Sequence, residues 1–175
     1  TAKINEDIAG RAYQQQAIRS VAEAIETHNQ RRSLVVMATG AGKTRTVIAL
    51  VDLLMRANYV KRVLFLADRV SLVKQATREF SKHLPSAGIV NLLEGTDASG
   101  RVYVSTYPTM LNLVNNNKED VRKFGIGYFD LVIVDEAHRS IYAKYGALFD
   151  YFDSYLVGLT ATPKNEVDHN TYRLF

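Results

Sequence analysis

The chain has 175 residues, of which 47% are hydrophobic and 23% are charged, and it contains no cysteine. This length suits one domain with a sizeable core, and the lack of cysteine excludes disulfide scaffolds, thiolate zinc sites and catalytic cysteines. The apolar runs are far shorter than the roughly 18 residues that a membrane span needs, and residues 1–6 lack the apolar core of a signal peptide. The net charge of +4 permits a polyanionic partner without requiring one. We therefore expect one cytoplasmic domain that makes no membrane contact.

Short apolar runs alternate along the chain with stretches of helical periodicity. Strands are predicted, in chain order, at residues 34–38, 63–67, 88–93, 102–105, 131–134 and 155–160. The first strand leads into a helix over residues 44–55, and the second into a helix whose apolar face carries Leu72, Val73, Ala76 and Phe80. Turns are predicted at residues 94–100, and a polar surface loop at residues 115–120. Strands that are apolar on both faces and alternate with helices predict an α/β fold, a parallel β-sheet flanked by helices on both faces.

A phosphate-binding loop is predicted where the first strand meets the helix over residues 44–55. Its residues are Thr39, Gly40, Ala41, Gly42, Lys43 and Thr44. Glycines let consecutive backbone N–H groups face a phosphate, and the helix N-terminus adds a favourable dipole. Lys43 is expected to contact the terminal phosphates of a nucleotide, and the Thr44 hydroxyl to ligate Mg²⁺. Met37 stands where the strict pattern has glycine, and the alternative interpretation is a glycine-containing turn with an exposed lysine.

Two adjacent carboxylates, Asp135 and Glu136, directly follow the strand at residues 131–134. Ligands bind at the carboxyl ends of strands in open α/β sheets, and carboxylates there are costly to bury without a cation. Asp135 is predicted to hold Mg²⁺ and Glu136 to activate an attacking water, the alternative being an acidic helix cap. We expect the pair to face the same triphosphate-sized pocket as residues 40–44. His138 is either a surface or capping residue or a relay between the nucleotide and another element, since no second His or Cys lies at metal-ligand spacing.

Six segments, taken in order, resemble the motifs of superfamily 2 helicases and DNA translocases. Residues 37–44 resemble motif I, and residues 135–138 resemble motif II. The other likenesses are residues 11–14 with Ala17 and Ile18 to the Q motif, residues 66–69 to motif Ia, residues 104–107 to motif Ib and residues 158–163 to motif III. More closely, residues 135–142, 148–152 and 159–168 look like the motor of type I restriction enzyme R subunits.

This resemblance implies that residues 1–175 form a single RecA-like lobe of a P-loop NTPase that binds ATP and Mg²⁺. Lys43 and Glu136 would then be its catalytic residues. Gln14 would hydrogen-bond the adenine edge, with Arg11 or Tyr13 packing against the ring. The alternative for Gln14 is an ordinary surface position on the first helix.

The same resemblance implies roles in coupling and in DNA binding. His138, Thr160 and Thr162 would couple the nucleotide state to the grip on nucleic acid, and Arg69 and Thr106 would contact the phosphate backbone of double-stranded DNA. The two threonines could instead be ordinary β-branched residues at the end of a strand.

A second basic feature, the stripe of Lys74, Arg78 and Lys82, recurs every four residues on one helix face. Such stripes can track a phosphate backbone, but a solvated helix face is the preferred interpretation here. Arg69 is favoured as the DNA contact because family contacts come mainly from loops at strand ends.

Few residues follow the last motif and Thr1 is not an initiator, so we expect a fragment of a longer polypeptide whose second RecA-like lobe supplies an arginine finger. The isolated lobe is expected to bind ATP weakly and to hydrolyse it very slowly. The predicted function is the ATP-binding motor of a DNA translocase in a type I restriction-modification system, with modification and specificity subunits as partners. Two alternatives are a lobe of an ATP-dependent repair or remodelling helicase and a nucleotide switch without hydrolysis, against which Glu136 argues.

Overall fold

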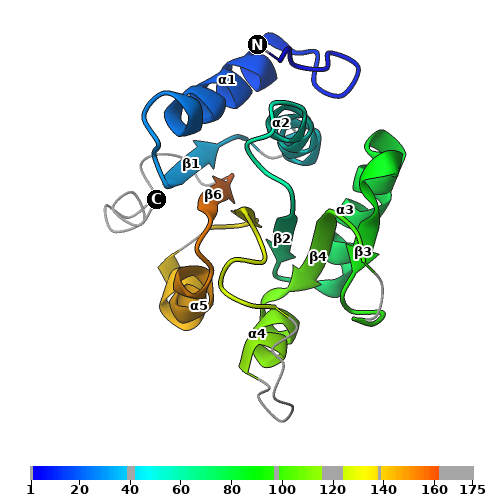
Figure 1. Cartoon of the computed structure of the whole chain (residues 1–175), viewed down its shortest axis with the longest axis vertical. Coiled ribbons are helices and arrows are strands. Elements are labelled where there is room, and N and C mark those ends of the chain that lie inside the picture. Colours follow the sequence, from blue (N-terminus) through cyan, green and yellow to red (C-terminus); the bar gives the residue numbers. More distant parts are fainter. Residues whose placement is uncertain (1, 39–41, 97–98, 116–123, 138, 162–175) are drawn as a thin grey trace.

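A six-stranded, all-parallel β-sheet forms the centre of the computed structural model, which describes residues 2–38, 42–96, 99–115, 124–137 and 139–161 (Figure 1). The sheet order is β1-β6-β5-β2-β4-β3. Its strands are β1 (Arg32–Val36), β2 (Val63–Ala67), β3 (Ile89–Asn91), β4 (Val102–Thr106), β5 (Leu131–Val134) and β6 (Tyr155–Thr160). The helices are α1 (Ala12–Glu26), α2 (Lys43–Arg56), α3 (Val70–His83), α4 (Tyr107–Asn115) and α5 (Arg139–Tyr151), with a 3₁₀ turn at Pro85–Ala87.

Helices cover both faces of this sheet, α1, α2 and α3 on one side and α4 and α5 on the other (Figure 1). The strand side chains alternate between two separate cores. Phe65 and Ile133 pack with the first set of helices, whereas Leu64 and Val132 pack with the second. Because both faces are buried, these strands need apolar residues at every position. The predicted α/β class with a doubly covered parallel sheet is confirmed.

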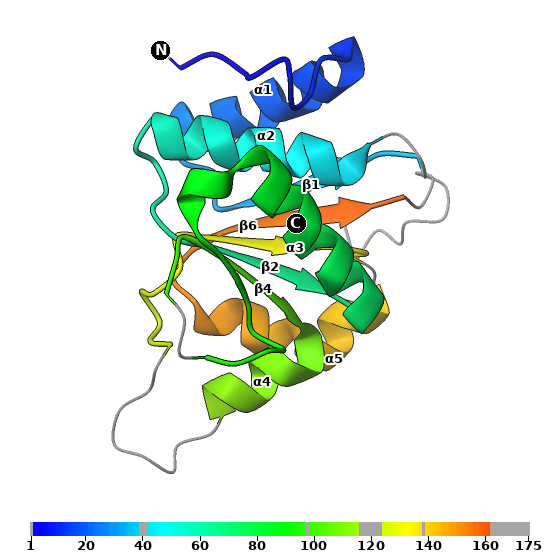
Figure 2. The same cartoon turned by 90° about the vertical axis from the view of Figure 1, so that its right-hand side faces the viewer.

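The parallel arrangement brings the carboxyl ends of the strands to one edge of the sheet. Figure 2 shows the strand arrowheads pointing the same way, and the registers align Val134 of β5 with Leu66 of β2 and Gly158 of β6. The segments that follow β2, β4, β5 and β6 therefore emerge beside one another. In open α/β sheets this edge is where ligands bind.

Strands β2, β5 and β6 have the predicted bounds, but β1 and β3 differ. β1 begins at the polar residue Arg32, two positions before the predicted start, because Arg32 and Ser33 pair with β6. β1 is an edge strand and is less buried than the central strands; Val36, for example, is 37% exposed. Polar residues are therefore tolerated at its start, and a search for apolar runs did not find them. β3 is shorter than predicted, since Gly88 adopts a positive φ of 71° before it and a turn closes after Asn91.

The predicted helices, loop and turn compare with the structure as follows. The two predicted amphipathic helices are present as α2 and α3, extended by one or a few residues. Most of the predicted polar loop, residues 116–120, and part of the predicted turn, residues 97–98, lie outside the described residues. In the part of the chain that the structure describes, no helix combines the length and apolar character that crossing a bilayer would require.

The core on the α1–α3 side of the sheet predicts that two aliphatic residues differ strongly in their contribution to the free energy of unfolding. Leu54 of α2 is fully buried, whereas Val70 at the start of α3 is 52% exposed. Leu54→Ala is expected to lower the free energy of unfolding by about 2–5 kcal/mol, because it leaves a cavity as well as losing buried surface. Val70→Ala should change it by less than about 0.5 kcal/mol. Denaturant titration followed by circular dichroism measures both, and equal effects would contradict the assigned core.

Candidate active site

The end of the predicted phosphate loop lies at the carboxyl edge of the sheet, where α2 begins. Gly42 caps this helix in the left-handed conformation, with φ 79° and ψ 42°, which strongly favours glycine. Its carbonyl oxygen accepts hydrogen bonds from the Thr46 backbone N–H at 3.0 Å and from the Thr46 hydroxyl at 2.9 Å. Lys43 and Thr44 form the first turn of α2, while Thr39, Gly40 and Ala41 lie outside the described residues.

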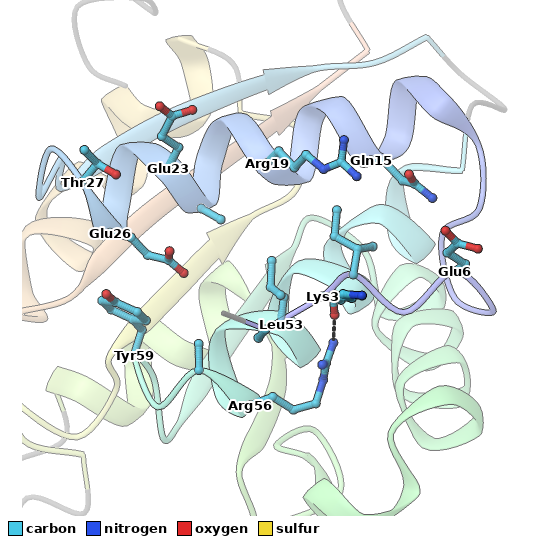
Figure 3. A pocket seen from close by; sticks show the side chains of 14 residues that line it. Lys3, Glu6, Gln15, Arg19, Glu23, Glu26, Thr27, Leu53, Arg56 and Tyr59 are labelled. Atoms are coloured by element: carbon cyan, nitrogen blue, oxygen red, sulfur yellow. Dashed lines mark hydrogen bonds between the residues drawn. The ribbon is translucent and has the colours of Figure 1, made fainter.

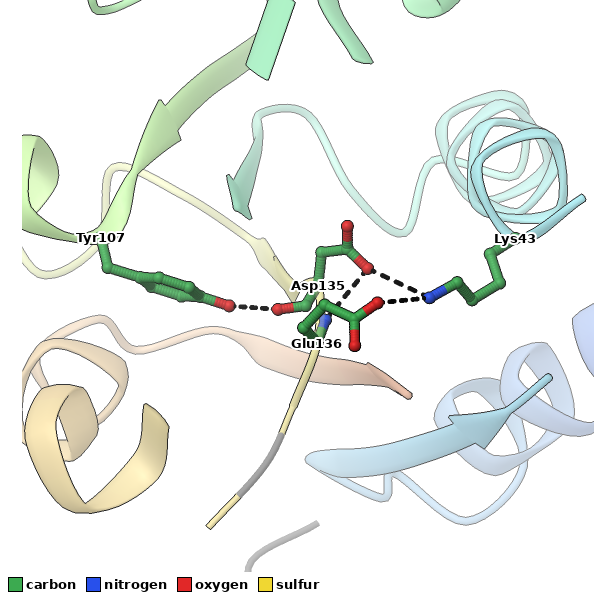
Figure 4. Close-up of polar contacts among 4 residues, drawn as sticks. All are labelled: Lys43, Tyr107, Asp135 and Glu136. Atoms are coloured by element: carbon green, nitrogen blue, oxygen red, sulfur yellow. Dashed lines mark hydrogen bonds and ion pairs between the residues drawn. The ribbon is translucent and has the colours of Figure 1, made fainter. Parts of the chain in front are cut away.

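Lys43 points from the start of α2 toward the two carboxylates that follow β5 (Figure 4). Its Nζ lies 2.8 Å from Glu136 Oε1 and 3.7 Å from Asp135 Oδ1. The Lys43 and Asp135 side chains are only 18% and 16% exposed, and that of Glu136 is 35% exposed. The structure thus brings the end of the predicted loop and the carboxylate pair together, as the sequence predicted. The alternative of an exposed lysine in a glycine turn is wrong.

The electrostatics of the pair fit a site that takes a cation. Burial raises the pKa of Asp135; the Lys43 charge acts in the opposite direction, and the Glu136 carboxylate adds to the increase. Burial therefore disfavours the ionised form of Asp135 more than Lys43 favours it, and a further positive charge beside Asp135 would favour ionisation. Among the described residues no group of three His, Asp or Glu side chains could hold a metal by itself. A metal bound at Asp135 would need oxygen ligands from phosphate and water, as Mg²⁺ commonly uses.

The backbone around the carboxylates is fixed by neighbouring elements. The Asp135 N–H donates to Leu66 O of β2 at 2.9 Å, and the Ala137 N–H donates to Leu159 O of β6 at 2.7 Å. Between them, Glu136 has a φ of 54°, an uncommon conformation for a residue with a side chain. The buried Tyr107 hydroxyl donates to the Asp135 main-chain oxygen. Tyr107 belongs to the segment that resembles motif Ib, but it was not predicted as a site residue, because its contact with Asp135 spans 28 residues of chain.

Gln14 of α1 contacts the phosphate-loop end directly. Its side-chain Nε2 donates to Gly42 O at 3.4 Å, and its Oε1 accepts the Arg11 backbone N–H at 3.2 Å. Gln14 is 5% exposed, so the alternative of an ordinary surface position is wrong. Nearby, the exposed Arg11 guanidinium donates to the Tyr13 hydroxyl at 2.8 Å. Adenine recognition by Gln14, with Arg11 or Tyr13 against the ring, stays a prediction.

The predicted coupling and DNA-binding residues occupy different environments at the same edge. Thr160 ends β6 with no exposed surface, and its carbonyl accepts the Met37 N–H at 3.0 Å, whereas Thr162 and His138 lie outside the described residues. Arg69 is exposed at the N-cap of α3. Thr106 ends β4, is 6% exposed, and donates its hydroxyl to Thr109 Oγ1 at 3.1 Å. Arg69 is thus the more accessible of the two predicted DNA contacts.

A separate hollow lies away from these residues. It has a volume of about 1210 Å³ and lies between the N-terminal segment, α1 and the end of α2, and Figure 3 shows the side chains that line it. Arg19 and Glu23 from α1 line it together with Arg56, which donates to Lys3 O. Acidic and basic side chains are mixed around it, and neither Lys43 nor Asp135 lines it. This groove is therefore separate from the candidate active site at Lys43 and Asp135.

A parallel sheet with a lysine at the start of α2 facing two carboxylates after β5 is the arrangement of a RecA-like lobe of a P-loop NTPase. The sequence profile of the family described as type III restriction enzyme, res subunit, matches residues 7–165. The chain belongs to that family.

Two type I restriction proteins are similar to this chain. The endonuclease subunit of type I restriction enzyme EcoAI from Escherichia coli is 37% identical over 174 residues, which cover 93% of this chain and 20% of that subunit. A solved fragment of an HsdR subunit of a type I restriction enzyme from Vibrio vulnificus YJ016 is 29% identical, with a TM-score of 0.68, covering 94% of this chain and 28% of that one. This chain resembles a helicase-like region of the R subunit, and it spans a fifth of the length of the EcoAI relative.

The fold also matches a more distant motor. The SWI2/SNF2 ATPase core of Sulfolobus solfataricus, solved in complex with double-stranded DNA, has a TM-score of 0.71 at 18% identity. The match covers 94% of this chain and 35% of that one. At this identity the likeness concerns the fold alone.

The raised pKa of Asp135 predicts a pH-dependent stability difference. In the folded state Asp135 binds its proton more tightly than in the unfolded chain, so its ionisation costs folding free energy as pH rises above the ordinary carboxyl range. Asp135→Asn should therefore stabilise the nucleotide-free protein at neutral pH, and the gain should vanish in acid, where Asp135 is protonated in both states. Denaturant titrations between about pH 3 and pH 7 measure this.

A matched change at an exposed carboxylate provides the control. Asp153, whose side chain is 77% exposed and pairs with Arg31 at the surface, should show no such pH-dependent gain as Asp153→Asn. If Asp135→Asn lowers stability at neutral pH, the attraction to Lys43 outweighs burial and the assigned electrostatics are wrong.

Proposed function

We propose that the chain is the ATP-binding motor lobe of a DNA translocase in a type I restriction system, coupling ATP hydrolysis to movement along double-stranded DNA. The observation that carries this proposal is the position of Lys43 Nζ, 2.8 Å from Glu136 Oε1 and 3.7 Å from Asp135 Oδ1 at the carboxyl edge of the sheet. A phosphate-binding lysine beside two carboxylates is the arrangement that phosphoryl transfer to water requires. The likeness to EcoAI and HsdR subunits supports the restriction setting.

Each residue of the site has a proposed task in this chemistry. Lys43 leaves its carboxylate partners to donate to the terminal phosphates of ATP, and the Gly42 turn and the α2 N-terminus orient those phosphates. Thr44 and Asp135 would hold Mg²⁺, which when bound would neutralise phosphate charge. Glu136 accepts a proton from the attacking water once Lys43 has moved away. Thr39, Gly40 and Ala41 complete the phosphate loop in this proposal.

The adenine end and the coupling elements complete the proposed cycle. Gln14 already contacts Gly42, so adenine binding at α1 would act directly on the conformation of the phosphate loop. Arg11 or Tyr13 would pack against the ring. Thr160 ends β6 and pairs with Val36 of β1. Together with His138 and Thr162, it would couple the bound nucleotide to the strength of DNA binding.

The proposed partners follow from the same likeness. A second RecA-like lobe of the same polypeptide would supply the arginine that stabilises the transition state, so the lobe alone should turn ATP over very slowly. Modification and specificity subunits would join it in a cytoplasmic restriction complex. The phosphate backbone of double-stranded DNA would run along the edge that carries Arg69 and Thr106.

Replacing Glu136 separates a motor from a nucleotide switch. In the complete gene product, assembled with its partner subunits, Glu136→Gln is expected to lower ATP turnover at least about a hundredfold, because the base beside the attacking water is lost. ATP affinity should change by less than about threefold, since the amide can still accept a hydrogen bond from Lys43. Phosphate release and equilibrium binding of a fluorescent ATP analogue measure the two quantities.

The exposed Glu26 at the end of α1 provides a matched control, and Glu26→Gln should leave both quantities unchanged. A Glu136→Gln protein that binds ATP and still hydrolyses it at the wild-type rate would overturn the hydrolytic proposal. A wild-type protein that binds ATP without turning it over would favour the switch.

Arg69 and Arg78 test where DNA runs. Arg69 lies at the carboxyl edge, whereas Arg78, nine residues further along α3, lies about 13 Å away from it along the helix. If Arg69 contacts one phosphate, Arg69→Ala should make the negative slope of log K against log salt shallower by about 0.9, and Arg78→Ala should leave the slope unchanged. Duplex binding measured by fluorescence anisotropy over a salt series decides this. A change in Arg78→Ala alone would show that the stripe of Lys74, Arg78 and Lys82 binds DNA instead.

A further inference from the structure

Tyr107 is a fully buried tyrosine at the junction between β4 and α4. Its ring stacks on that of Tyr145 from α5, with centroids 5.1 Å apart and planes 18° apart. The ring of Phe149, also on α5, contacts it edge-on at 5.9 Å. Tyr107 has no solvent-exposed surface. The ring is therefore held in one orientation by packing, which a side chain needs if its hydroxyl is to fix another group.

The hydroxyl of this tyrosine reaches the backbone of the carboxylate pair. It donates to the main-chain oxygen of Asp135, and Figure 4 shows Tyr107 and Lys43 approaching the pair from opposite sides. Lys43 contacts the carboxylate groups, whereas Tyr107 contacts the chain that carries them. The two residues therefore constrain different parts of the same motif.

The backbone held in this way has an unfavourable conformation. The oxygen of Asp135 belongs to the peptide group that precedes Glu136, whose φ is 54°. A positive φ at a residue with a side chain persists only where the surroundings fix it. The N–H bonds from Asp135 to β2 and from Ala137 to β6 fix the two ends, and the Asp135 side chain accepts the Glu136 N–H at 3.0 Å. The remaining polar atom of that peptide group, the oxygen, is the one that Tyr107 binds.

We propose that Tyr107 is a positioning residue for ATP hydrolysis, whose hydroxyl holds the Asp135–Glu136 peptide so that the Glu136 carboxylate meets the attacking water. This assignment rests on the proposed function and adds to it a residue outside the carboxylate and phosphate-loop segments. Its effect belongs to the chemical step, because among the described residues the hydroxyl bonds Asp135 and not Gly42, Lys43 or the adenine-side residue Gln14. Tyr107 also follows Thr106 directly in the chain, so movement at a DNA contact there would reach Glu136 through one hydrogen bond.

Replacement by phenylalanine tests this with the least disturbance, since the packed ring is kept. In the complete gene product with its partner subunits, Tyr107→Phe is expected to lower kcat for ATP, per nucleotide-binding site, by about tenfold. The KM for ATP should change by less than about twofold. Counting nucleotide-binding sites by equilibrium titration removes any loss caused by misfolded protein.

Tyr103 provides the matched control. It is 1% exposed, lies on β4, the strand that leads into Tyr107, and its hydroxyl bonds that of Tyr128 at 2.7 Å, away from the carboxylates. Tyr103→Phe removes a buried hydroxyl as Tyr107→Phe does, so the two variants should lose similar thermal stability. Only Tyr107→Phe should lower kcat.

The outcomes are distinguishable. A tenfold loss of kcat in Tyr107→Phe alone, at unchanged KM, supports the assignment. A kcat within about twofold of wild type, an equal loss in Tyr103→Phe, or a parallel rise in KM would overturn it. If wild type hydrolyses ATP and Glu136→Gln does not, such a result leaves the proposed function standing. A wild-type protein without ATP turnover would overturn the proposed function and this assignment together.

Discussion

One ammonium group between two carboxylates organises this lobe. Lys43 belongs to the first turn of α2, whereas Asp135 and Glu136 belong to the segment after β5. Glu136 is 93 residues away from Lys43 in the chain. The Lys43 charge favours ionised carboxylates beside it, so the two segments are coupled electrostatically, although burial acts against the charge of Asp135. The contact therefore links the predicted phosphate loop to the strand end, and any ligand that enters must replace it with something of comparable charge.

The parallel sheet makes this meeting possible. Because β2, β5 and β6 run in the same direction, the backbone of Asp135 and Ala137 can hydrogen-bond Leu66 on one side and Leu159 on the other. Those two bonds extend the sheet by a few residues beyond β5, into the region where side chains become exposed. Glu136 lies in the turn directly after β5 with a positive φ, and the hydrogen bonds of Asp135 and Ala137 hold its backbone between β2 and β6. Rigid presentation is what a group that must meet a water molecule requires.

Residue patterns predicted the parts of this structure that depend on local chemistry. The strand at residues 131–134 and the glycine-lysine turn before α2 could both be predicted, because each needs particular residue types at adjacent positions. The helix α4 was not predicted: it has nine residues, begins Tyr-Pro and ends at Asn115, and so lacks a long apolar period. The contacts of Gln14 with Gly42 and of Tyr107 with Asp135 span 28 residues each and depend on how elements pack, which spacing along the chain does not encode.

The charge balance of the site constrains what it can bind. With both carboxylates ionised, one lysine leaves the cluster with a net negative charge, and burial already raises the pKa of Asp135. A triphosphate arriving alone would draw Lys43 away and leave two carboxylates facing several phosphate oxygens, an arrangement of like charges at close range. A divalent cation arriving with the nucleotide would reduce this repulsion by neutralising part of the negative charge, and in the proposed function Asp135 would help to hold it. If the proposed function is right, this charge balance would therefore favour a metal–nucleotide complex over the bare nucleotide.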